Sequence, residues 1–542
     1  MKLPRLALLA AALAAAAGCS SSAPSGSPSS TTATAPGHIL RLVTVGDIDG
    51  LNPLLRSQAL GTDIDLLVYG YFFELDDKMR YVPDLATEVP SRENGGVSAD
   101  GLTLTYHLRS GVKWQDGTPF TARDVVFTAN AIVRSKSAIS SPSGWDDIAR
   151  VEAIGDDEVR FHLKKLYAPA ISTFFCESGL YPVLPAHVLE KYSDITRAPF
   201  DHPIGTGPFR LVRWKRGESI ELQANAAYWR GRPKLDDIEY FEAPSTDAAV
   251  SILDDGNADG WLRAPAGLYE KLKGLRGFNV ESSPTLSYTH LDLNQENRTL
   301  DDPRVRKAIS LAIDRDALAA KVPGAGADAA YADISPLSWA YEKGKQPKPD
   351  PARARALLRA AGWLAAPGNT LRKGRQTLAF TLSTASDSST AQAIETLLQQ
   401  ELRGVGIETT IKDYPSDQLL APYGAGGVVF AGKYDAALFS WTAGADPDDS
   451  AEYMCDQIPP KGQNDLYWCD DKLDAAERGA LSTYDRTVRK RYYAVTQNEL
   501  ASQAATIVLY FERQASVTPA DMRGFAPAPS TSNNWNSWEW SI

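Results

Sequence analysis

One stretch near the start of the chain carries the clearest structural pattern, and residues 102–127 read LTLTYHLRSGVKWQDGTPFTARDVVF. Its first half alternates, so that one face of an extended strand holds the apolar residues Leu102, Leu104, Tyr106 and Leu108. This period of two predicts a half-buried antiparallel strand. The pair Asp116-Gly117 then predicts a turn. Thr121 and Asp124 form a capping-box pattern, which predicts that a helix begins there.

A second region predicts a parallel sheet. The segments 376–384 (QTLAFTLST) and 405–412 (VGIETTIK) are strand-like, and between them lies a helical pattern around 389–403 that ends at Gly404. A strand, a helix and a strand in this order form a βαβ unit, whose two strands lie parallel in one sheet. The segment 434–441 (YDAALFSW) is expected to add a further strand. The chain is therefore predicted to be mixed α/β.

The composition is that of a large, acidic and folded chain. It has 542 residues, 56 Lys plus Arg against 67 Asp plus Glu, and a net charge of −11. Such a chain lacks the basic face that neutralises phosphates, which argues against a nucleic-acid partner. Its 12 Trp, 22 Tyr and 16 Phe exclude a disordered chain, and only 4 Cys exclude a disulfide-built scaffold. At roughly 150 residues per domain, the length predicts about three domain-sized units.

The first residues predict an exported protein. Lys2 and Arg5 precede an apolar run over residues 6–17, and small residues follow it. A charged start, about a dozen apolar residues and a small-residue cleavage site are typical of a secretory signal peptide. The run is shorter than the roughly twenty residues that span a bilayer.

The end of this signal resembles a bacterial lipobox. Residues 16–19 read AAGC, and in a lipobox the thiol of Cys19 receives a lipid while the chain is cut before it. Residues 1–18 are then the signal peptide. The uncharged segment 19–37, rich in Ser, Pro and Gly, is a flexible lipid-anchored linker. The alternative is an ordinary signal peptide that contains a cysteine. Several acyl chains give stable anchoring, so the lipid is the only membrane contact expected.

The remaining cysteines and the histidines indicate no metal site. In an oxidising compartment Cys455 and Cys469 are candidates for a disulfide, whose loop of about fifteen residues corresponds to ~3 kcal/mol of stabilisation. Cys176, within ISTFFCESG, is expected to be a buried free thiol. The six histidines are scattered without the spacing of metal ligands.

Short motifs spread over residues 39–525 match one family in order. They are Lys113-Trp114, Asp116-Gly117-Thr118-Pro119, 122–127, 205–209 (GTGPF), Asn225, Tyr228-Trp229, Gly231, Pro233, 291–318, Ala361-Gly362-Trp363, Tyr434-Asp435 and Ser440-Trp441. This ordered set resembles the peptide/nickel-type solute-binding proteins of ABC importers, solute-binding protein family 5. Each motif also has a plain structural role. GTGPF lacks the Lys and helix start of a phosphate-binding loop and is interpreted as a turn. Arg304, Arg306 and Lys307 are interpreted as a solvated helix face, with contact to a permease as the alternative.

The resemblance implies a two-lobed, type II periplasmic-binding-protein-like fold with the ligand cleft between the lobes. The first lobe would use residues 38–285, with an inserted subdomain near 71–180. The second would use 286–514, and residues 515–542 would return to the first lobe. The chain crossings near 284–294 and 511–519 would form a hinge, about which such binders close on a ligand.

The resemblance also implies where a ligand is held. In peptide-binding members a Trp at the end of a strand packs over the ligand, and a carboxylate three residues later holds the peptide amino group. Here the Trp is Trp441, followed by Thr442, but the carboxylate position falls on Gly444. Asp446 is the candidate replacement, although a shift of two residues moves a side chain by about 6–7 Å in extended chain. Four further aromatic residues are weaker candidates for the cleft: Tyr510, Phe439, Trp145 and Tyr69.

The expected function is therefore that of an extracytoplasmic receptor, monomeric and without cofactor. It would capture a peptide or peptide-like solute and deliver it to the permease subunits of an ABC importer, either in the periplasmic space or on the outer face of the cytoplasmic membrane. A sugar or a metallophore is an alternative solute, and a sensor is an alternative use of the same fold. A secreted carbohydrate-active hydrolase is the alternative from another class, since 67 acids provide many acid/base pairs. The patterns GxSxG, HExxH and Walker A are absent from the sequence, and the family motifs contain no catalytic residue.

Overall fold

Two long antiparallel strands run through the middle of the fold. They are β11 (Phe278–Leu293) and β19 (Thr506–Pro519), and their pairing extends from Phe278↔Pro519 to Asp292↔Thr506. The computed structural model describes residues 38–542 except 57, 136–138, 140–143, 369 and 531–532. The predicted signal peptide, Cys19 and the linker 19–37 lie outside the described residues.

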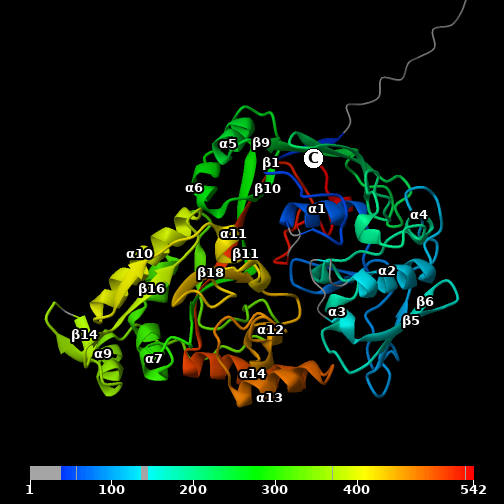
Figure 1. The fold of residues 1–542 in the computed structure, drawn as a ribbon. Helices are drawn as coiled ribbons and strands as arrows, with labels where there is room; N and C mark the ends of the chain where they lie inside the picture. The colour runs from blue at the N-terminus through cyan, green and yellow to red at the C-terminus, as the bar shows by residue number, and fades with distance from the viewer. Residues whose placement is uncertain (1–37, 57, 136–138, 140–143, 369, 531–532) are drawn as a thin grey trace, which may run out of the picture. The chain divides into compact units, whose positions relative to one another are not determined.

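The largest sheet is built around this pair. Its seven strands run in the order β10-β19-β11-β18-β16-β17, and β12 also pairs with β19 (Figure 1). The other members of the sheet are β10 (Trp261–Ala264), β12 (Ala327–Ala329), β16 (Ala379–Ser383), β17 (Glu408–Ile411) and β18 (Ala436–Thr442).

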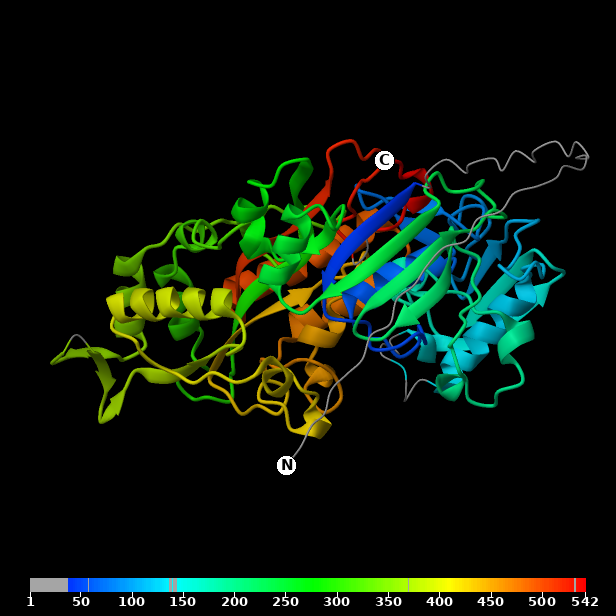
Figure 2. The same cartoon turned by 90° about the horizontal axis from the view of Figure 1, so that it is seen from above.

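Four smaller sheets contain the remaining strands. In Figure 2 the blue strand β1 lies beside the green strand β9, its parallel partner in a four-stranded sheet of order β1-β9-β8-β7. These strands are β1 (Ile39–Val45), β7 (Phe209–Lys215), β8 (Ser219–Ala224) and β9 (Asp237–Ala243). A three-stranded sheet has the order β4 (Thr103–His107), β6 (Glu158–Leu163), β5 (Ile148–Ile154). A two-stranded sheet pairs β2 (Phe73–Leu75) with β3 (Tyr81–Pro83). The last sheet has the order β13 (Leu364–Ala366), β14 (Thr370–Lys373), β15 (Gln376–Thr377).

Helices of four to eighteen residues surround these sheets. In chain order they are α1 (Ala59–Val68), α2 (Ala122–Ser135), α3 (Ala170–Thr173), α4 (Ala186–Leu189), α5 (Thr246–Asp254), α6 (Tyr269–Leu272), α7 (Pro303–Ala312), α8 (Arg315–Ala319), α9 (Pro351–Ala360), α10 (Ser389–Gly404), α11 (Ser416–Leu419), α12 (Ser450–Tyr453), α13 (Asp471–Leu481) and α14 (Arg486–Gln503). Along the described part of the chain, no helix is both long and apolar enough to cross a membrane.

The stretch 102–127 folds as its pattern predicts. Leu104 and Tyr106 of β4 are fully buried, and β4 pairs antiparallel with β6. Helix α2 begins at Ala122, where the Asp124 carboxylate accepts hydrogen bonds from the backbone N–H of Thr121 at 3.0 Å and of Ala186 at 2.9 Å. The same carboxylate accepts the indole N–H of Trp114 at 3.3 Å. One buried acid therefore joins the turn, the start of α2 and the start of α4.

The predicted βαβ unit is also present. Strands β16 and β17 are parallel neighbours, with α10 between them in sequence, and β18 lies parallel to β16 on its other side. Helix α10 begins where the Ser388 hydroxyl accepts a hydrogen bond from the N–H of Ala391 at 3.2 Å. Strand β18 joins this unit to the central pair, since it is the antiparallel partner of β11.

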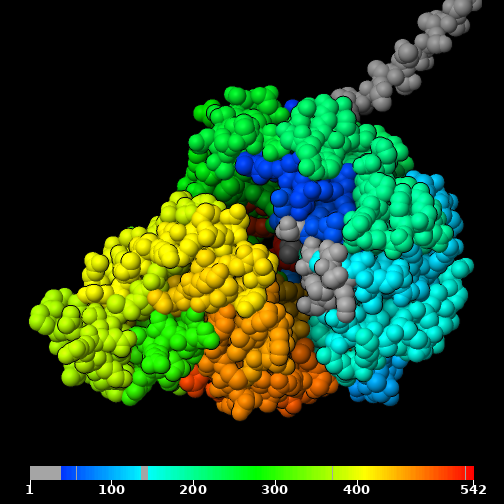
Figure 3. Space-filling view, viewed as in Figure 1, coloured from blue at the N-terminus to red at the C-terminus, as the bar shows by residue number. Residues whose placement is uncertain are grey.

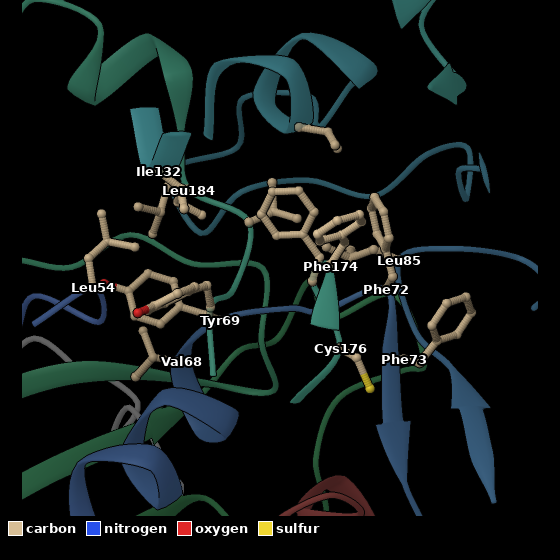
Figure 4. Packing of buried hydrophobic residues seen from close by; sticks show 14 of the residues in the cluster. Leu54, Val68, Tyr69, Phe72, Phe73, Leu85, Ile132, Phe174, Cys176 and Leu184 are labelled. Atoms are coloured by element: carbon tan, nitrogen blue, oxygen red, sulfur yellow. The ribbon is translucent and has the colours of Figure 1, made fainter. Parts of the chain in front are cut away.

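The buried side chains form separate cores. The first draws on residues 40–262 and Trp540, and Figure 4 shows Phe72, Phe174 and Leu85 of this core packed together. The second draws on residues 291–510. A third cluster contains Val43, Trp261 and Val517, so β19 contributes to both the second and the third. We propose that the first two cores mark the lobes expected at 38–285, with its insertion at 71–180, and at 286–514, and that 515–542 returns to the first lobe.

One surface expectation is wrong. Arg306 does not lie on a solvated face of α7 but is 3% exposed. Its guanidinium donates hydrogen bonds to the carbonyls of Leu300 at 2.9 Å, Asp301 at 2.7 Å and Gln503 at 3.2 Å. Burial lowers the pKa of Arg306 to about 10. The side chain therefore satisfies carbonyls of two separate segments and is not available to a permease.

The GTGPF motif forms a close backbone contact. Gly207 donates its N–H to the Val68 carbonyl at 2.9 Å, and a Cβ at position 205 would lie 1.8 Å from the same oxygen. Replacing Gly205 by Ala therefore requires the backbone to move. We expect Gly205→Ala to lower the free energy of unfolding by about 1–3 kcal/mol, the usual cost of overpacking, as measured by denaturant titration. Gly50→Ala is the control, because a Cβ at position 50 would have no other atom within 4 Å; equal effects of the two changes would contradict this account.

Candidate ligand-binding site

A cavity of about 600 Å³ lies at the end of β18. Its wall comes from residues 144–179, 286–288, 333–338, 441–463 and Leu481. In Figure 3 the cyan surface of residues near 100–200 lies beside the orange surface of residues near 450–500. Two hydrogen bonds join these parts, from the N–H of Ala168 to the Leu481 carbonyl at 3.2 Å and from the Tyr484 hydroxyl to the Gly101 carbonyl at 3.4 Å. The volume is in the range of small-molecule sites.

Irregular pairing in β11 shapes one wall of the cavity. The register steps from Pro284↔Arg513 to Tyr288↔Phe511, so β11 holds two more residues than β19 in this interval. The Thr285 hydroxyl fills the gap by donating to the Glu512 carbonyl at 2.9 Å. Leu286 and Tyr288, at and beyond the irregularity, line the cavity. Bulges of this kind redirect side chains and are common beside binding sites.

Trp441 lies on the cavity wall. It pairs with Tyr288 across β18 and β11, and its half-buried ring packs against a small cluster formed by Tyr288, Ala330, Val508 and Phe511. Thr442 also lines the cavity, and its hydroxyl lies 2.8 Å from that of Ser287. Gly444 follows in the same wall.

Asp446 lines the cavity, but its charge is already paired. Its two carboxylate oxygens accept hydrogen bonds from the guanidinium of Arg489, at 2.6 Å and 2.5 Å. The side chains of Arg489 and Asp446 are only 4% and 10% exposed. Asp446 therefore does not present a free carboxylate for a ligand amino group, contrary to the expectation that it replaces the acid absent at Gly444. Its partner was not visible in the sequence because Arg489 lies in α14, 43 positions later.

The four weaker aromatic candidates lie outside this cavity. Trp145 is 0% exposed and packs against Phe174 and Phe175 in the first core. Tyr69 is 2% exposed in the same core, beside Leu54 and Val68 in Figure 4. The expectation that these two line the cleft is therefore corrected: both are core residues.

Phe439 and Tyr510 lie on another cavity, of about 230 Å³, together with Thr289, Glu512 and Arg513. Phe439 sits two residues before Trp441 on β18, yet it packs on the His290 ring, with ring centres 4.4 Å apart. Neither side chain contributes to the wall that contains Trp441 and Gly444.

An acidic cluster beside Trp441 was missed by the sequence analysis. Asp333, Asp448, Asp449 and Glu452 line the cavity, and Glu477 of α13 is buried behind them. Burial and the neighbouring charges of Glu477 and Asp333 raise the pKa of Asp449 well above its ordinary value. Burial, and next the charge of Asp448, raises the pKa of Glu452 to about 8. Burial likewise raises the pKa of Glu477 to about 8.

Three parts of the chain supply these acids. They are residues 448–452, in and just before α12, then Glu477 of α13, and Asp333, more than a hundred residues earlier. The run DPDDS at 446–450 was the only local signal of the cluster. Within the described residues, no group of three or more His, Cys, Asp or Glu side chains is arranged to hold a metal ion.

A disulfide closes the segment that follows α12. It joins Cys455 and Cys469, with their sulfur atoms 1.96 Å apart. The loop between them includes Gln457 and Gln463, which line the cavity. Cys176 is a buried free thiol, and burial raises its pKa to about 12.

Comparison with known proteins identifies the family. Residues 80–458 match the model of the bacterial extracellular solute-binding proteins, family 5. The chain belongs to this family. Its members are binding proteins and not enzymes, which sets aside the hydrolase alternative, and they work outside the cytoplasm.

Relatives cover nearly the whole chain. The oligopeptide-binding protein AppA of Bacillus subtilis is 28% identical over 502 residues, covering 90% of this chain and 88% of AppA. The glutathione-binding protein GsiB of Escherichia coli O157:H7 is 29% identical over 501 residues, covering 90% of this chain and 92% of GsiB.

Solved structures confirm the predicted fold class, a two-lobed type II periplasmic-binding-protein fold. The structure of Bacillus subtilis AppA in complex with a nonapeptide has a TM-score of 0.75 and 27% identity, covering 93% of this chain and 98% of that chain. The structure of NikZ from Campylobacter jejuni in complex with Ni(L-His) has a TM-score of 0.77 and 26% identity, covering 94% of this chain and 100% of NikZ. The family thus supports a solute-binding role for an ABC importer.

The acidic cluster gives the protein a defined response to pH. A carboxyl with a raised pKa in the folded state holds its proton up to about pH 8 for Glu452, whereas the ordinary value is 4.5. Between these values the unfolded chain binds fewer protons, so stability falls as pH rises. We expect Glu452→Gln to lose less stability than the wild type between pH 5 and 8, as measured by thermal unfolding of the ligand-free protein. Glu270→Gln, a change at an exposed acid of α6, should keep the wild-type slope; parallel curves for Glu452→Gln and the wild type would refute the assignment.

Proposed function

We propose that this protein captures a peptide or peptide-like solute in the cavity beside Trp441 and delivers it to the permease subunits of an ABC importer. The observation that carries the proposal is the wall made by Trp441, Thr442 and the following loop. Trp441 offers an aromatic face of the kind that packs over a bound solute. Trp441 is the cross-strand neighbour of Tyr288 and packs against it, which holds the ring in place.

Backbone groups in the same wall suit a peptide. Among the described residues, no hydrogen bond uses the N–H of Gly444, Ala445 or Asp446, although all three line the cavity. The N–H of Ala443, just before them, is already bound to the Leu286 carbonyl at 3.3 Å. Free backbone donors recognise the carbonyls of an extended peptide without regard to its side chains. This arrangement supports a solute with repeated amide groups.

The proposal predicts binding that depends on Trp441. Protein refolded after removal of endogenous ligand should show a rise of several degrees in its unfolding midpoint with some members of a panel of short peptides. Trp441→Ala should weaken the affinity for such a peptide by about tenfold or more, because it removes aromatic contact area, while the protein still folds with a lower unliganded midpoint, because the ring also packs against buried residues. Isothermal titration calorimetry would measure this effect.

Tyr423→Ala is the matched control, because Tyr423 is 46% exposed and lies outside the cavity wall. Its affinity should equal that of the wild type. A panel in which sugars or metallophores bind and peptides do not would overturn the peptide assignment, and equal affinity of Trp441→Ala and the wild type would remove Trp441 from the site.

We further propose that Cys19 carries the lipid anchor and that the mature protein is a monomer held at the outer face of the cytoplasmic membrane or in the periplasmic space. The AAGC sequence at 16–19 and the uncharged segment after it support this proposal. We expect Cys19→Ser to abolish labelling with radioactive palmitate in a host that processes lipoproteins, and to move the protein from the membrane fraction to the released fraction. Wild-type protein that carries no label would show that the segment is an ordinary signal peptide.

A further inference from the structure

The part of the fold that contains α9 carries a concentration of positive charge. Residues 351–377, from the start of α9 to the end of β15, contain six Lys or Arg and no Asp or Glu. All six are exposed, and they are Arg353, Arg355, Arg359, Arg372, Lys373 and Arg375. The acidic balance of the whole chain predicted no basic face, and the structure corrects that expectation for this region.

These six charges have no ionic partner. Among the described residues, none of the six forms an ion pair with a carboxylate. A hydrogen bond from Arg304 and the more distant charge of Lys373 lower the pKa of Asp302, but that carboxylate is paired with Arg304 at 2.6 Å. Elsewhere on the surface, by contrast, Lys271 lies 2.9 Å from Asp247. The basic residues of 351–377 are therefore free to bind an external anion.

Packing directs these charges outward from a fixed support. Ala354 and Leu358 place one face of α9 in the second core, so the arginines of α9 lie toward solvent. Trp363 and Leu371 anchor the strands β13–β15 in the same core. In Figure 2 these strands, in lime green, project from the body of the fold. The helix and the strands together, residues 351–377, are called the basic surface below.

An exposed apolar side chain lies among these charges. Leu364 of β13 is directly opposite Arg372 of β14, and cross-strand neighbours share one face of a sheet. Leu364 is 62% exposed, more than any other large apolar side chain among the described residues. Guanidinium and ammonium groups bind phosphate, while an apolar side chain between them enters the boundary between headgroups and acyl chains. Such a combination is typical of surfaces that lie on anionic membranes.

We propose that the basic surface docks on the anionic headgroups of a phospholipid membrane, with Leu364 entering the interface. A lipid surface is favoured over a nucleic acid because the family works outside the cytoplasm and because phosphate binding alone gives Leu364 no role. Docking goes beyond solute capture, since no residue of 351–377 lines the cavity beside Trp441. It determines which end of the receptor faces the membrane.

The test measures binding to vesicles of two compositions. The mature chain 19–542 with Cys19→Ser is used, so that no lipid of its own contributes. It is sedimented with vesicles of phosphatidylcholine alone, or of phosphatidylcholine and phosphatidylglycerol in a two-to-one ratio. The partition coefficient should be about tenfold larger or more for the mixed vesicles, and it should fall as salt screens the charges. Equal partition into the two kinds of vesicle would overturn the proposal.

A charge variant assigns the binding to the basic surface. The triple change Arg372→Gln, Lys373→Gln and Arg375→Gln should remove most of the preference for phosphatidylglycerol. The control, Lys271→Gln, Lys273→Gln and Arg276→Gln, removes the same total charge from exposed residues in and after α6. It should keep the preference. Equal losses in the two variants would show that net charge alone drives binding and would overturn the assignment to this surface.

An apolar variant distinguishes lipid from other polyanions. Leu364→Ser should lower the partition into mixed vesicles severalfold, because less apolar area enters the interface. Val212→Ser is the control, since Val212 of β7 is 52% exposed outside the basic surface, and it should bind as the wild type does. A single-stranded oligonucleotide bound as tightly as the mixed vesicles, with Leu364→Ser unchanged toward both, would overturn lipid as the partner.

These outcomes are independent of the proposed function. The vesicle measurements contain no solute, so their failure leaves peptide capture standing, and a failure of peptide capture leaves them unaffected. Thermal unfolding shows which variants are folded. If the triple variant does not fold, the comparison of the two vesicle compositions with the wild type, together with Leu364→Ser, still decides.

Discussion

The pairing of β11 with β19 is the constraint on which the rest of the structure depends. These two strands contribute side chains to separate cores, as Leu291 and Ile507 do in one and Val517 in another. Strand β18 reaches the cavity because it pairs with β11, and β10 is held by β19. The irregular interval from Pro284 to Tyr288 then sets which side chains face the cavity. A shift of register by one residue would move Trp441 and Tyr288 to the opposite face of the sheet.

Charge placement gives the site its second constraint. The sequence contains more acids than bases, and most of this excess could be solvated surface. The fold instead gathers five acids around one cavity and directs the nearby arginine of α14 to Asp446. The outcome is a polar wall in which burial and neighbouring carboxyl groups raise the pKa of Asp449 and Glu452. The pH response of stability is therefore a consequence of how the fold gathers these acids.

Much of the fold could be predicted because its signals are local. The alternation at 102–108, the capping pattern at Thr121 and Asp124, and the βαβ unit at 376–412 all depend on neighbours within a few positions, and all three are present. Trp441 and Gly444 were found through family motifs of the same local kind. Trp145 and Tyr69 were misplaced, because an aromatic residue has the same local appearance whether it fills a core or lines a cavity. Arg306 was misplaced for the same reason, since its carbonyl partners lie on two segments.

The sequence by itself determined the secondary structure of the main elements, the fold class and the family. Only the tertiary structure decided which charges are compensated. Asp446 and Arg489 are 43 residues apart, and Asp333 is more than a hundred residues from Asp449, so no local pattern shows that the first pair is bonded and the second is crowded. The energy of a charge depends on the groups within a few ångströms of it in space and on the water excluded around it. Both are set by the packing of distant segments.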